Sequence, residues 1–385
     1  MTEPFPPPVT TTGHAERTAH DPLLTVEDLT VEFSTEDGVV RAVRGVSYEL
    51  RRGEALGIVG ESGSGKSVTS LAVMGLLPRS ARIAGSAWLA GDELLGLGDE
   101  AMSRVRGRRI SMIFQDPLTS LNPVYSIGKQ IAEAVLAHHK VTKQVAWDRA
   151  VELLETVGIP FPKQRAQSYP HELSGGMRQR VVIAIAMAND PDVIIADEPT
   201  TALDVTVQAQ VLEALEAARA KTGAALILIT HDLGVIAGHA DRVCVMYAGK
   251  LVETGTVDEI FYRPRMPYTL GLLGSLPRVD DSGRTRLTPI LGAPPSLLNL
   301  PPGCPFTPRC PIARDRCDAD EPELTGTDAA GHRAACHFHG EVAGHAAQDL
   351  FETTAADPDL APAPASSPTA ASAPATATTD QEAKP

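Results

Sequence analysis

The chain has 385 residues, of which 34 are basic and 48 acidic, so its net charge is −14 at pH 7. An apolar fraction of 43% excludes disorder of the whole chain, and the longest apolar run, Val181 to Ala188, is far below the ~20 residues that cross a bilayer. The acidic balance argues against non-specific nucleic-acid binding. No secretory signal is visible, so we expect a reducing compartment, where clustered cysteines indicate metal more often than disulfides.

The first 21 residues are rich in Pro, Thr and His and are predicted to be disordered, whereas residues 22–275 have the composition of a globular domain. Within this domain, Leu23–Leu50 alternates in short runs interrupted by Glu36-Asp37-Gly38, which predicts an antiparallel hairpin. Five β-rich runs then alternate with helical patterns, which predicts an α/β fold with a mostly parallel sheet. These runs are Ala55–Val59, Ile110–Phe114, Val193–Ala196, Ala225–Thr230 and Arg242–Tyr247.

Three further segments differ from this pattern in composition and in the spacing of apolar residues. Apolar residues recur at helical spacing between about residues 117 and 172, which predicts a helical subdomain. Between residues 276 and 340 Pro and Cys become frequent and periodicity is lost, which predicts a small loop-rich C-terminal segment. Residues 341–385 are dominated by small and polar residues and Pro, and are predicted to form a disordered tail.

A glycine-rich loop follows the first predicted parallel strand and fits the P-loop pattern G-x-x-x-x-G-K-[ST]. Glycines allow backbone N–H groups to wrap around phosphates, and a helix starting at about Lys66 adds its positive dipole end. Lys66 is expected to reach the β- and γ-phosphates, and the Ser67 hydroxyl to bind Mg²⁺. The predicted nucleotide-binding residues of this loop are Gly60, Glu61, Ser62, Gly63, Ser64, Gly65, Lys66 and Ser67.

Two carboxylates end the buried run Val193–Ala196, at the edge where a parallel sheet presents its ligands. Asp197 can hold Mg²⁺, directly or through water, and Glu198 can accept a proton from an attacking water. A second possible anion site is the helix start at Ser174-Gly175-Gly176, where Ser174 suits an N-cap position. Taken alone, that stretch fits an ordinary capped helix as well.

The C-terminal segment contains four of the five cysteines, with the spacing C-x5-C-x6-C-x18-C. These are Cys304, Cys310, Cys317 and Cys336. Four thiolates on short loops suit tetrahedral Zn²⁺ or an iron–sulfur cluster, and a segment without metal is the remaining alternative. The nearby His332, His337 and His339 keep a mixed Cys/His zinc site open. Cys244 stands apart in a predicted strand and suits a buried apolar position.

In their order along the chain, these motifs resemble those of ABC transporter ATPases, and of the peptide/nickel importer branch in particular. The motifs that carry the resemblance to the family are the P-loop, Gln115 in Phe114–Pro117, the signature Leu173–Gly176, Asp197-Glu198, Ala202–Asp204 and Thr230–Asp232. Those similar to the branch are Tyr169–Glu172, Met177–Arg180, Leu118–Pro123 and the cysteine-bearing Leu300–Cys317. The resemblance implies a P-loop NTPase (RecA-like) core with an antiparallel β subdomain, a helical subdomain and a small C-terminal Cys domain.

The resemblance also implies roles for single residues. Gln115 would couple Mg²⁺ and the attacking water to a membrane subunit, and His231 would contact the γ-phosphate. Phe33 would stack on adenine, although it suits a core strand position as well. The residues implied to lie at a dimer interface, over the ATP of a partner subunit, are Ser174, Gly175, Gly176 and Asp204.

The function implied by the resemblance is that of a peripheral ATPase subunit at the cytoplasmic face of the membrane, which uses ATP and Mg²⁺ to power import of oligopeptides or dipeptides. Implied partners are a second, homologous ATPase chain, two transmembrane permease subunits and an extracytoplasmic substrate-binding protein, with no nucleic acid. Some ATPases of this branch have a [4Fe–4S] site in the corresponding tail, which favours that cluster over Zn²⁺. Its role would be structural, because the segment is far in sequence from the catalytic motifs. The alternatives are a nickel or other small-solute importer and a non-transport ABC ATPase acting on DNA or the ribosome.

Overall fold

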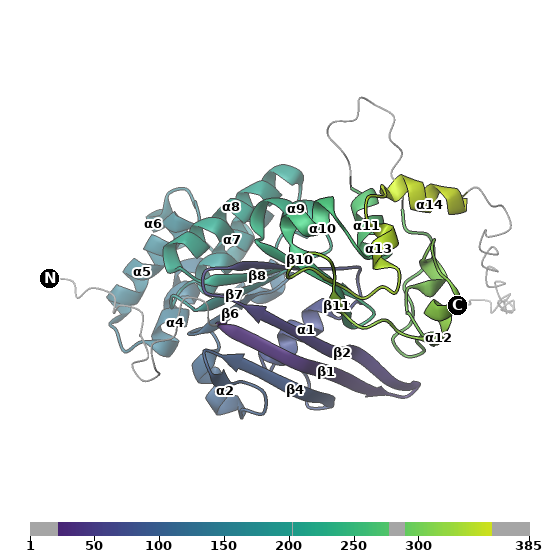
Figure 1. The fold of residues 1–385 in the computed structure, drawn as a ribbon. Helices are drawn as coiled ribbons and strands as arrows, with labels where there is room; N and C mark the ends of the chain where they lie inside the picture. Colours follow the sequence, from purple (N-terminus) through teal and green to yellow (C-terminus); the bar gives the residue numbers. More distant parts are fainter. Residues whose placement is uncertain (1–21, 202, 277–288, 356–385) are drawn as a thin grey trace, which may run out of the picture.

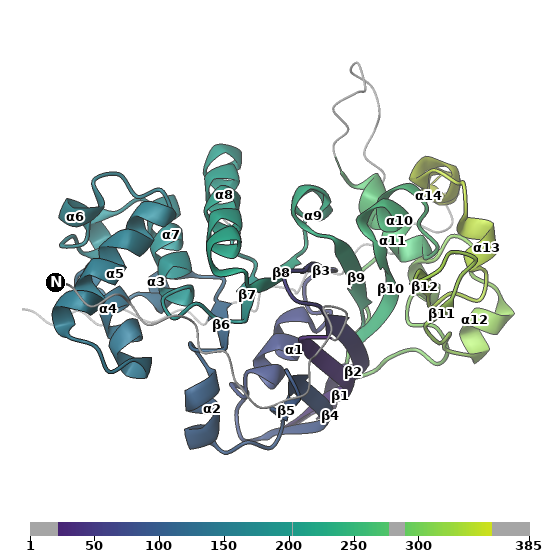
Figure 2. The same cartoon turned by 60° about the vertical axis from the view of Figure 1, so that its left-hand side comes forward.

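The computed structural model describes residues 22–201, 203–276 and 289–355 (Figure 1). The disorder predicted for residues 1–21 and for residues 356–385 lies outside this part of the chain. Two sheets occupy the middle of the molecule, with a group of helices at one end and the C-terminal segment at the other (Figure 2). Within the described ranges, no helix combines the length and the apolar character that crossing a membrane requires.

The predicted N-terminal hairpin is confirmed. β1 (Leu24–Thr35) pairs antiparallel with β2 (Gly38–Leu50), and the two strands are joined by Glu36-Asp37. β4 (Ala81–Leu89) pairs with the other edge of β1, and β5 (Asp92–Glu93) pairs with β4. The hairpin is therefore part of a four-stranded antiparallel sheet, and the sequence analysis did not predict its last two strands.

The second sheet has eight strands in the order β11-β12-β10-β9-β3-β8-β7-β6. All five predicted strands are present in it and run parallel to one another. β10 and β12 continue it in antiparallel pairs, so the C-terminal segment extends the central sheet. The bounds are β3 (Ala55–Val59), β6 (Ile110–Ile113), β7 (Val193–Asp197), β8 (Ala225–Thr230), β9 (Arg242–Tyr247), β10 (Lys250–Thr256), β11 (Thr325–Gly326) and β12 (Arg333–Ala334).

The central strands divide the hydrophobic core in two, because successive side chains point to opposite faces of a sheet. On one face, Leu56 and Ile58 of β3 belong to a core shared with the antiparallel sheet and with helix α1 (Lys66–Val73). On the other face, Ala55 and Val59 belong to a second core, which includes most of the helices that follow residue 120. Covering both faces fixes the neighbouring strands β3, β8 and β7, whose carboxyl ends therefore lie side by side.

The region predicted to be helical does contain a group of helices. Helix α7 carries the signature at its start and packs against α3, α4 and α5 of this group, and also against α8. Gly176 permits the close approach of α7 to α8, because a Cβ atom there would lie 2.3 Å from Val207 Cγ1. The bounds are α2 (Asp99–Val105), α3 (Pro117–Ser120), α4 (Ile127–His138), α5 (Lys143–Thr156), α6 (Pro162–Arg165), α7 (Gly175–Ala186), α8 (Val205–Thr222), α9 (Leu233–His239), α10 (Val257–Tyr262) and α11 (Pro267–Gly274).

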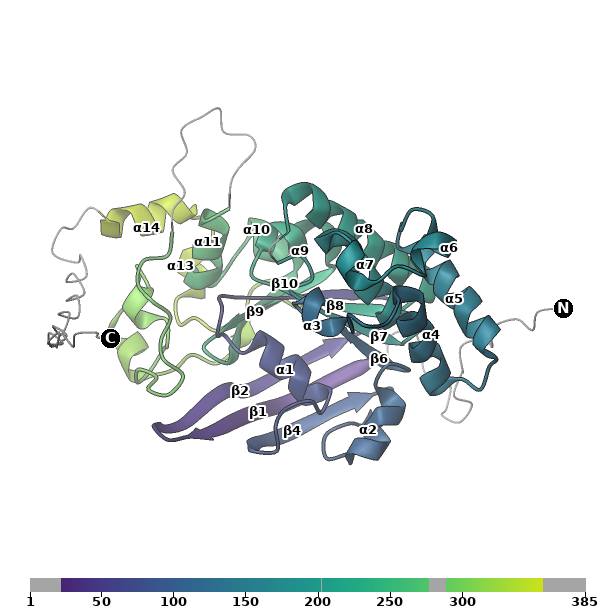
Figure 3. The same cartoon turned by 180° about the vertical axis from the view of Figure 1, so that it is seen from behind.

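The C-terminal segment lies beside α11, at the end of the molecule opposite the helical group (Figure 3). Its regular elements are short, as the loss of periodicity predicts. The disorder predicted from residue 341 is wrong for residues 341–355: helix α14 packs against α11, and Phe351 is buried because it joins the main core. The bounds are α12 (Asp315–Ala319), α13 (His339–Val342) and α14 (Ala347–Ala355), with a 3-10 turn at Thr307–Arg309.

Candidate functional site

The P-loop connects β3 to α1 and has the conformation that its glycines predict. Gly60, Gly63 and Gly65 have φ values of 156°, 79° and 103°. A Cβ atom would lie 2.1 Å from Met246 O at Gly60 and 2.4 Å from Ala42 O at Gly65, so neither position accepts a side chain. No side chain caps the start of α1, which leaves its first N–H groups available to an anion.

Lys66 is buried at the start of α1, directly beneath this loop. Its Nζ donates hydrogen bonds to Gly60 O at 2.8 Å and to Glu61 O at 3.0 Å. Burial lowers the pKa of Lys66, and the carboxylates of Glu198, Asp197 and Glu61 oppose that effect. The ammonium group therefore lies among the carbonyls of the loop that is predicted to bind phosphate.

Ser67 and Asp197, the two predicted Mg²⁺ ligands from α1 and β7, are in direct contact. Ser67 Oγ donates a hydrogen bond to Asp197 Oδ1 at 2.9 Å. Burial raises the pKa of Asp197, while the hydrogen bond from Ser67 lowers it. A hydroxyl and a carboxylate are hard oxygen donors that suit Mg²⁺, so this pair fits the predicted ion.

Glu198 is the point at which the three predicted catalytic residues meet. Its carboxylate accepts a hydrogen bond from Gln115 Nε2 at 3.0 Å and lies 3.4 Å from His231 Nδ1. The residue has a positive φ of 46°, a conformation that costs energy outside glycine and is often found at functional sites. Thr201 Oγ1 also donates to this carboxylate, at 2.9 Å. The sequence analysis missed Thr201, whose contact depends on the turn after β7.

An open cavity of about 810 Å³ lies in front of these groups, and its walls come from three regions. The hairpin contributes Phe33 and Val40, and the P-loop contributes its backbone. Phe33, the predicted adenine-stacking residue, thus lines the same cavity as the P-loop. Leu272 and Leu297 complete the wall from the C-terminal third of the chain. The sequence analysis missed these two leucines, because they belong to no motif.

The signature lies outside this cavity, since Ser174, Gly175 and Gly176 are absent from its lining. Ser174 is the N-cap of α7, as predicted, and its Oγ accepts a hydrogen bond from Met177 N–H at 3.3 Å. Asp204 caps α8 by accepting hydrogen bonds from the N–H groups of Thr206 and Val207. Both helix starts are thus built locally, without contact with this chain's own nucleotide pocket.

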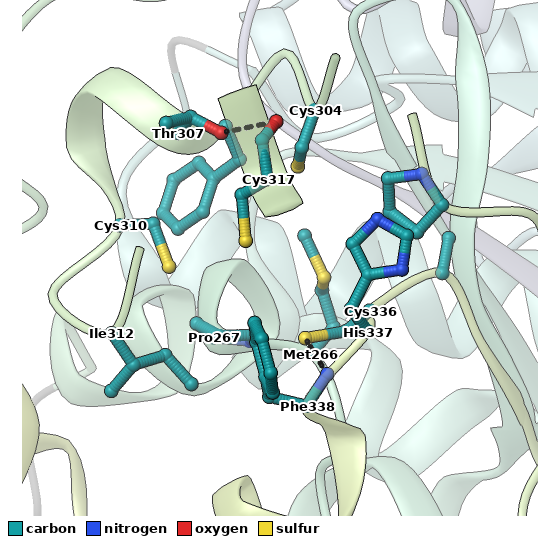
Figure 4. Close-up of a pocket in the computed structure, with 13 residues that line it drawn as sticks. Met266, Pro267, Cys304, Thr307, Cys310, Ile312, Cys317, Cys336, His337 and Phe338 are labelled. Carbon is teal, nitrogen blue, oxygen red and sulfur yellow. Dashed lines mark hydrogen bonds between the residues drawn. The ribbon is translucent and has the colours of Figure 1, made fainter. Parts of the chain in front are cut away.

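A separate, small pocket in the C-terminal segment brings the four predicted cysteines together (Figure 4). Burial raises the pKa of Cys310 and that of Cys336 to about 12. Within the described residues, no group of three or more His, Cys, Asp or Glu side chains is already arranged to hold a metal ion. In the described residues, the four thiols thus line one pocket without being arranged around a common centre.

The nearby histidines do not complete a mixed zinc site in this pocket. His337 lines the pocket, but its Nε2 lies 3.0 Å from Asp320 O. His332 lies elsewhere, where its Nε2 is 2.7 Å from Glu253 Oε1 and both side chains are fully buried. His332 thus joins β10 to the C-terminal segment. Cys244 is buried in β9, as predicted.

A P-loop, an Asp-Glu pair at the end of a buried strand, and a glutamine and a histidine that meet at the glutamate together define an ATP-binding cassette. Residues 43–201 match the family described as ABC transporter, and residues 252–317 match the family described as oligopeptide/dipeptide transporter, C-terminal region. The chain belongs to the family of oligopeptide and dipeptide ABC transporter ATP-binding proteins, because it is 52% identical over 326 residues to the dipeptide transport ATP-binding protein DppD of Bacillus subtilis. That alignment covers 84% of this chain and 97% of the relative.

Other comparisons agree at the level of the fold and the family. The oligopeptide transport ATP-binding protein OppD of Mycobacterium tuberculosis is 58% identical over 331 residues, which are 86% of this chain and 54% of the relative. The chain thus spans about half the length of that mycobacterial relative. The dimeric structure of MJ0796, a bacterial ABC transporter cassette, matches with a TM-score of 0.55 and 25% identity over 61% of this chain and 98% of that one.

Proposed function

We propose that this chain binds and hydrolyses ATP as the nucleotide-binding subunit of an importer for oligopeptides or dipeptides. The observation that carries the proposal is the meeting of Gln115 and His231 at the Glu198 carboxylate, beside the hydrogen-bonded pair Ser67 and Asp197. The relatives are oligopeptide and dipeptide transport ATP-binding proteins, which supports the class of cargo.

In this proposal, each group of the site has one task. Lys66 and the loop N–H groups bind and orient the β- and γ-phosphates, and Phe33 stacks on the adenine. Ser67, Asp197 and Gln115 hold Mg²⁺, which neutralises charge that develops on the phosphates. Glu198 accepts a proton from the attacking water, and His231 contacts the γ-phosphate.

We propose that the functional unit contains two ATPase chains. The signature glycines lie outside this chain's own pocket and remain available to the nucleotide of a second, homologous subunit, with Asp204 at the interface. Two permease subunits and an extracytoplasmic substrate-binding protein complete the proposed complex, and no nucleic acid takes part. The chain would then associate with the cytoplasmic face of the membrane through the permeases.

The test is reconstitution of the complete complex in lipid vesicles, with the wild-type chain and with Glu198→Gln. Binding protein loaded with peptide should increase ATP hydrolysis and drive peptide uptake, and the Gln variant should abolish both. The wild-type chain alone should hydrolyse ATP slowly, at a rate that rises with protein concentration. Stimulation by nickel but not by peptide would support the small-solute alternative, and stimulation of the isolated chain by DNA or ribosomes would contradict a transport role.

We also propose that Cys304, Cys310, Cys317 and Cys336 hold a [4Fe–4S] cluster, with Zn²⁺ as the alternative. The shared pocket supports this, because the four thiols lie around one space whose other lining residues are mostly apolar, with Thr307 and His337 as the polar exceptions. Bound metal would hold the four thiols as thiolates and join the segments that carry them, so it would contribute folding free energy.

Elemental analysis of anaerobically purified protein tests the metal proposal. We expect about four irons per chain and a brown colour, both lost in Cys310→Ser. Cys244→Ala is the matched control, because Cys244 is buried in β9 outside the pocket and its removal should leave the iron content unchanged. One zinc per chain would support the alternative, and no metal at all would contradict both.

A further inference from the structure

An ion pair joins the C-terminal segment directly to the P-loop. Arg309 Nη1 and Nη2 donate hydrogen bonds to the two carboxylate oxygens of Glu61, at 2.7 and 2.8 Å. This paired geometry matches the planar guanidinium group and is not available to lysine. The Arg309 side chain is only 4% exposed and that of Glu61 24%. The segment is far in sequence from the catalytic motifs, but it is in contact with one of them.

Glu61 is the second residue of the P-loop, and each of its polar groups is held. Its carboxylate is bound by Arg309, and its N–H donates a hydrogen bond to Tyr268 Oη at 2.8 Å. Its carbonyl oxygen accepts from Lys66 Nζ. Because three glycines of this loop have positive φ values, the loop backbone has many accessible conformations, and contacts at Glu61 limit them.

Arg309 is itself fixed by its surroundings. Its Nε donates a hydrogen bond to Leu291 O at 3.2 Å, and its Nη1 lies 3.4 Å from Tyr247 Oη. Tyr247, Tyr268 and Phe306 pack against one another with ring centroids 4.5 to 5.5 Å apart. Tyr268 and Phe306 are fully buried, so the guanidinium group is presented to the P-loop from a rigid base.

The same short turn reaches both the P-loop and the cysteine pocket. Arg309 ends the 3-10 turn that begins at Thr307, and Cys310 is the next residue. Thr307 Oγ1 donates a hydrogen bond to Cys317 O at 3.2 Å, and Cys304 N–H donates to the same oxygen at 2.7 Å. A displacement of the cysteine loops would therefore move Arg309.

We propose that Arg309 is a positioning residue for nucleotide binding, which holds Glu61 in place and neutralises its carboxylate at the mouth of the phosphate site. Glu61 lines the nucleotide cavity, so without Arg309 an unpaired carboxylate would face the incoming triphosphate and repel it. The C-terminal segment thus completes the P-loop. The inference depends on the proposed function, since it assumes that this cavity binds ATP.

The first experiment measures binding of a non-hydrolysable ATP analogue to the full-length chain. Arg309→Gln should raise the Kd about tenfold, because a charge-assisted pair is lost and a negative charge is left at the site. Arg314→Gln is the matched control: its ion pair with Glu341 lies in the same segment, but both side chains are 52% exposed. In the assembled complex, the KM for ATP should rise in Arg309→Gln while kcat stays within about twofold.

A double-mutant cycle separates this role from general support of the fold. Glu61→Gln removes the repelling charge but keeps the shape of the side chain. The variant with both substitutions should therefore bind the analogue more tightly than Arg309→Gln alone. Equal affinity of Arg309→Gln and wild type for the analogue would overturn the inference. So would a loss of affinity on Arg309→Gln that is as large in the Glu61→Gln background as in the wild type. Failure of the wild-type chain to bind the analogue would instead contradict the proposed function.

A third measurement tests the link to the cysteine pocket. Cys310→Ser should weaken binding of the analogue severalfold in the wild-type background, because the loop that positions Arg309 is released. In the Arg309→Gln background, Cys310→Ser should not weaken binding of the analogue any further. The Arg309→Gln variant itself should contain as much metal as the wild type. Additive effects of the two substitutions would show that the cysteine pocket does not act through Arg309.

Discussion

The P-loop and the cysteine segment position their functional groups in different ways. In the P-loop, eight consecutive residues form the site, and the backbone itself supplies most of the donors. The cysteine segment gathers side chains from residues 304 to 336 and is tied to the cassette by distant partners, such as Glu253 for His332 and Glu61 for Arg309. A site made from contiguous backbone is visible in a sequence pattern, whereas the docking of a loop-rich segment depends on contacts that no pattern contains.

The largest effect on ATP hydrolysis that we expect is that of Glu198→Gln. This variant tests whether a sequence pattern identifies the catalytic base correctly. The amide keeps the shape of the side chain but cannot accept a proton, so hydrolysis should fall by about 10²- to 10⁴-fold. Affinity for ATP should be unchanged. Phosphate release by the assembled complex, together with binding of an ATP analogue, measures both quantities.

A matched variant distinguishes the role of the Glu198 carboxylate from that of the hydrogen bond that it accepts from Thr201. Thr201→Val removes only the hydrogen bond that Thr201 donates to Glu198, so its hydrolysis rate should fall much less than that of Glu198→Gln. Near-normal turnover in Glu198→Gln would show that the base lies elsewhere and that the sequence pattern misidentified the site.

Lys66→Ala should have the next largest effect, on binding and not on turnover alone. Loss of a charge-assisted contact with phosphate should weaken binding by about 1.5–3 kcal/mol, or roughly 10- to 100-fold in Kd. Titration of an ATP analogue into the purified chain measures this loss. Lys221→Ala is the control, because Lys221 pairs with Glu152 on the helical side and is absent from the cavity lining.

The sequence alone predicted the catalytic half of the molecule well. The hairpin and the five parallel strands follow from the residue pattern, and the place of Asp197-Glu198 follows from the strand that they end. The roles of Gln115 and His231 come from the resemblance to ABC transporter ATPases. The sequence did not predict Thr201, the cavity leucines or the helix α14. These depend on turn geometry and on packing between segments far apart in sequence, as when Phe351 enters the main core.

The smallest expected effect concerns how the cysteine segment is attached to the cassette. Glu321 accepts hydrogen bonds from Arg44 of β2 and Lys250 of β10. Burial raises the pKa of Glu321, but these two cations outweigh burial and hold it below its usual value. Glu321→Gln should therefore lower the melting temperature at pH 7 by about 2 °C. Glu341→Gln is the control, since its ion pair with Arg314 is exposed.

The dependence of this difference on pH tests its cause. A carboxylate whose pKa is lower in the folded chain contributes stability above its unfolded pKa of about 4.3, and that contribution is lost as the pH falls through the folded value. The gap in melting temperature between wild type and Glu321→Gln should thus be full at pH 7 and should shrink well below pH 4. A gap that persists at low pH would mean that Glu321 stabilises the docked segment by packing and not by charge. The segment would then be held to the cassette by other polar contacts, such as His332–Glu253 and Arg309–Glu61.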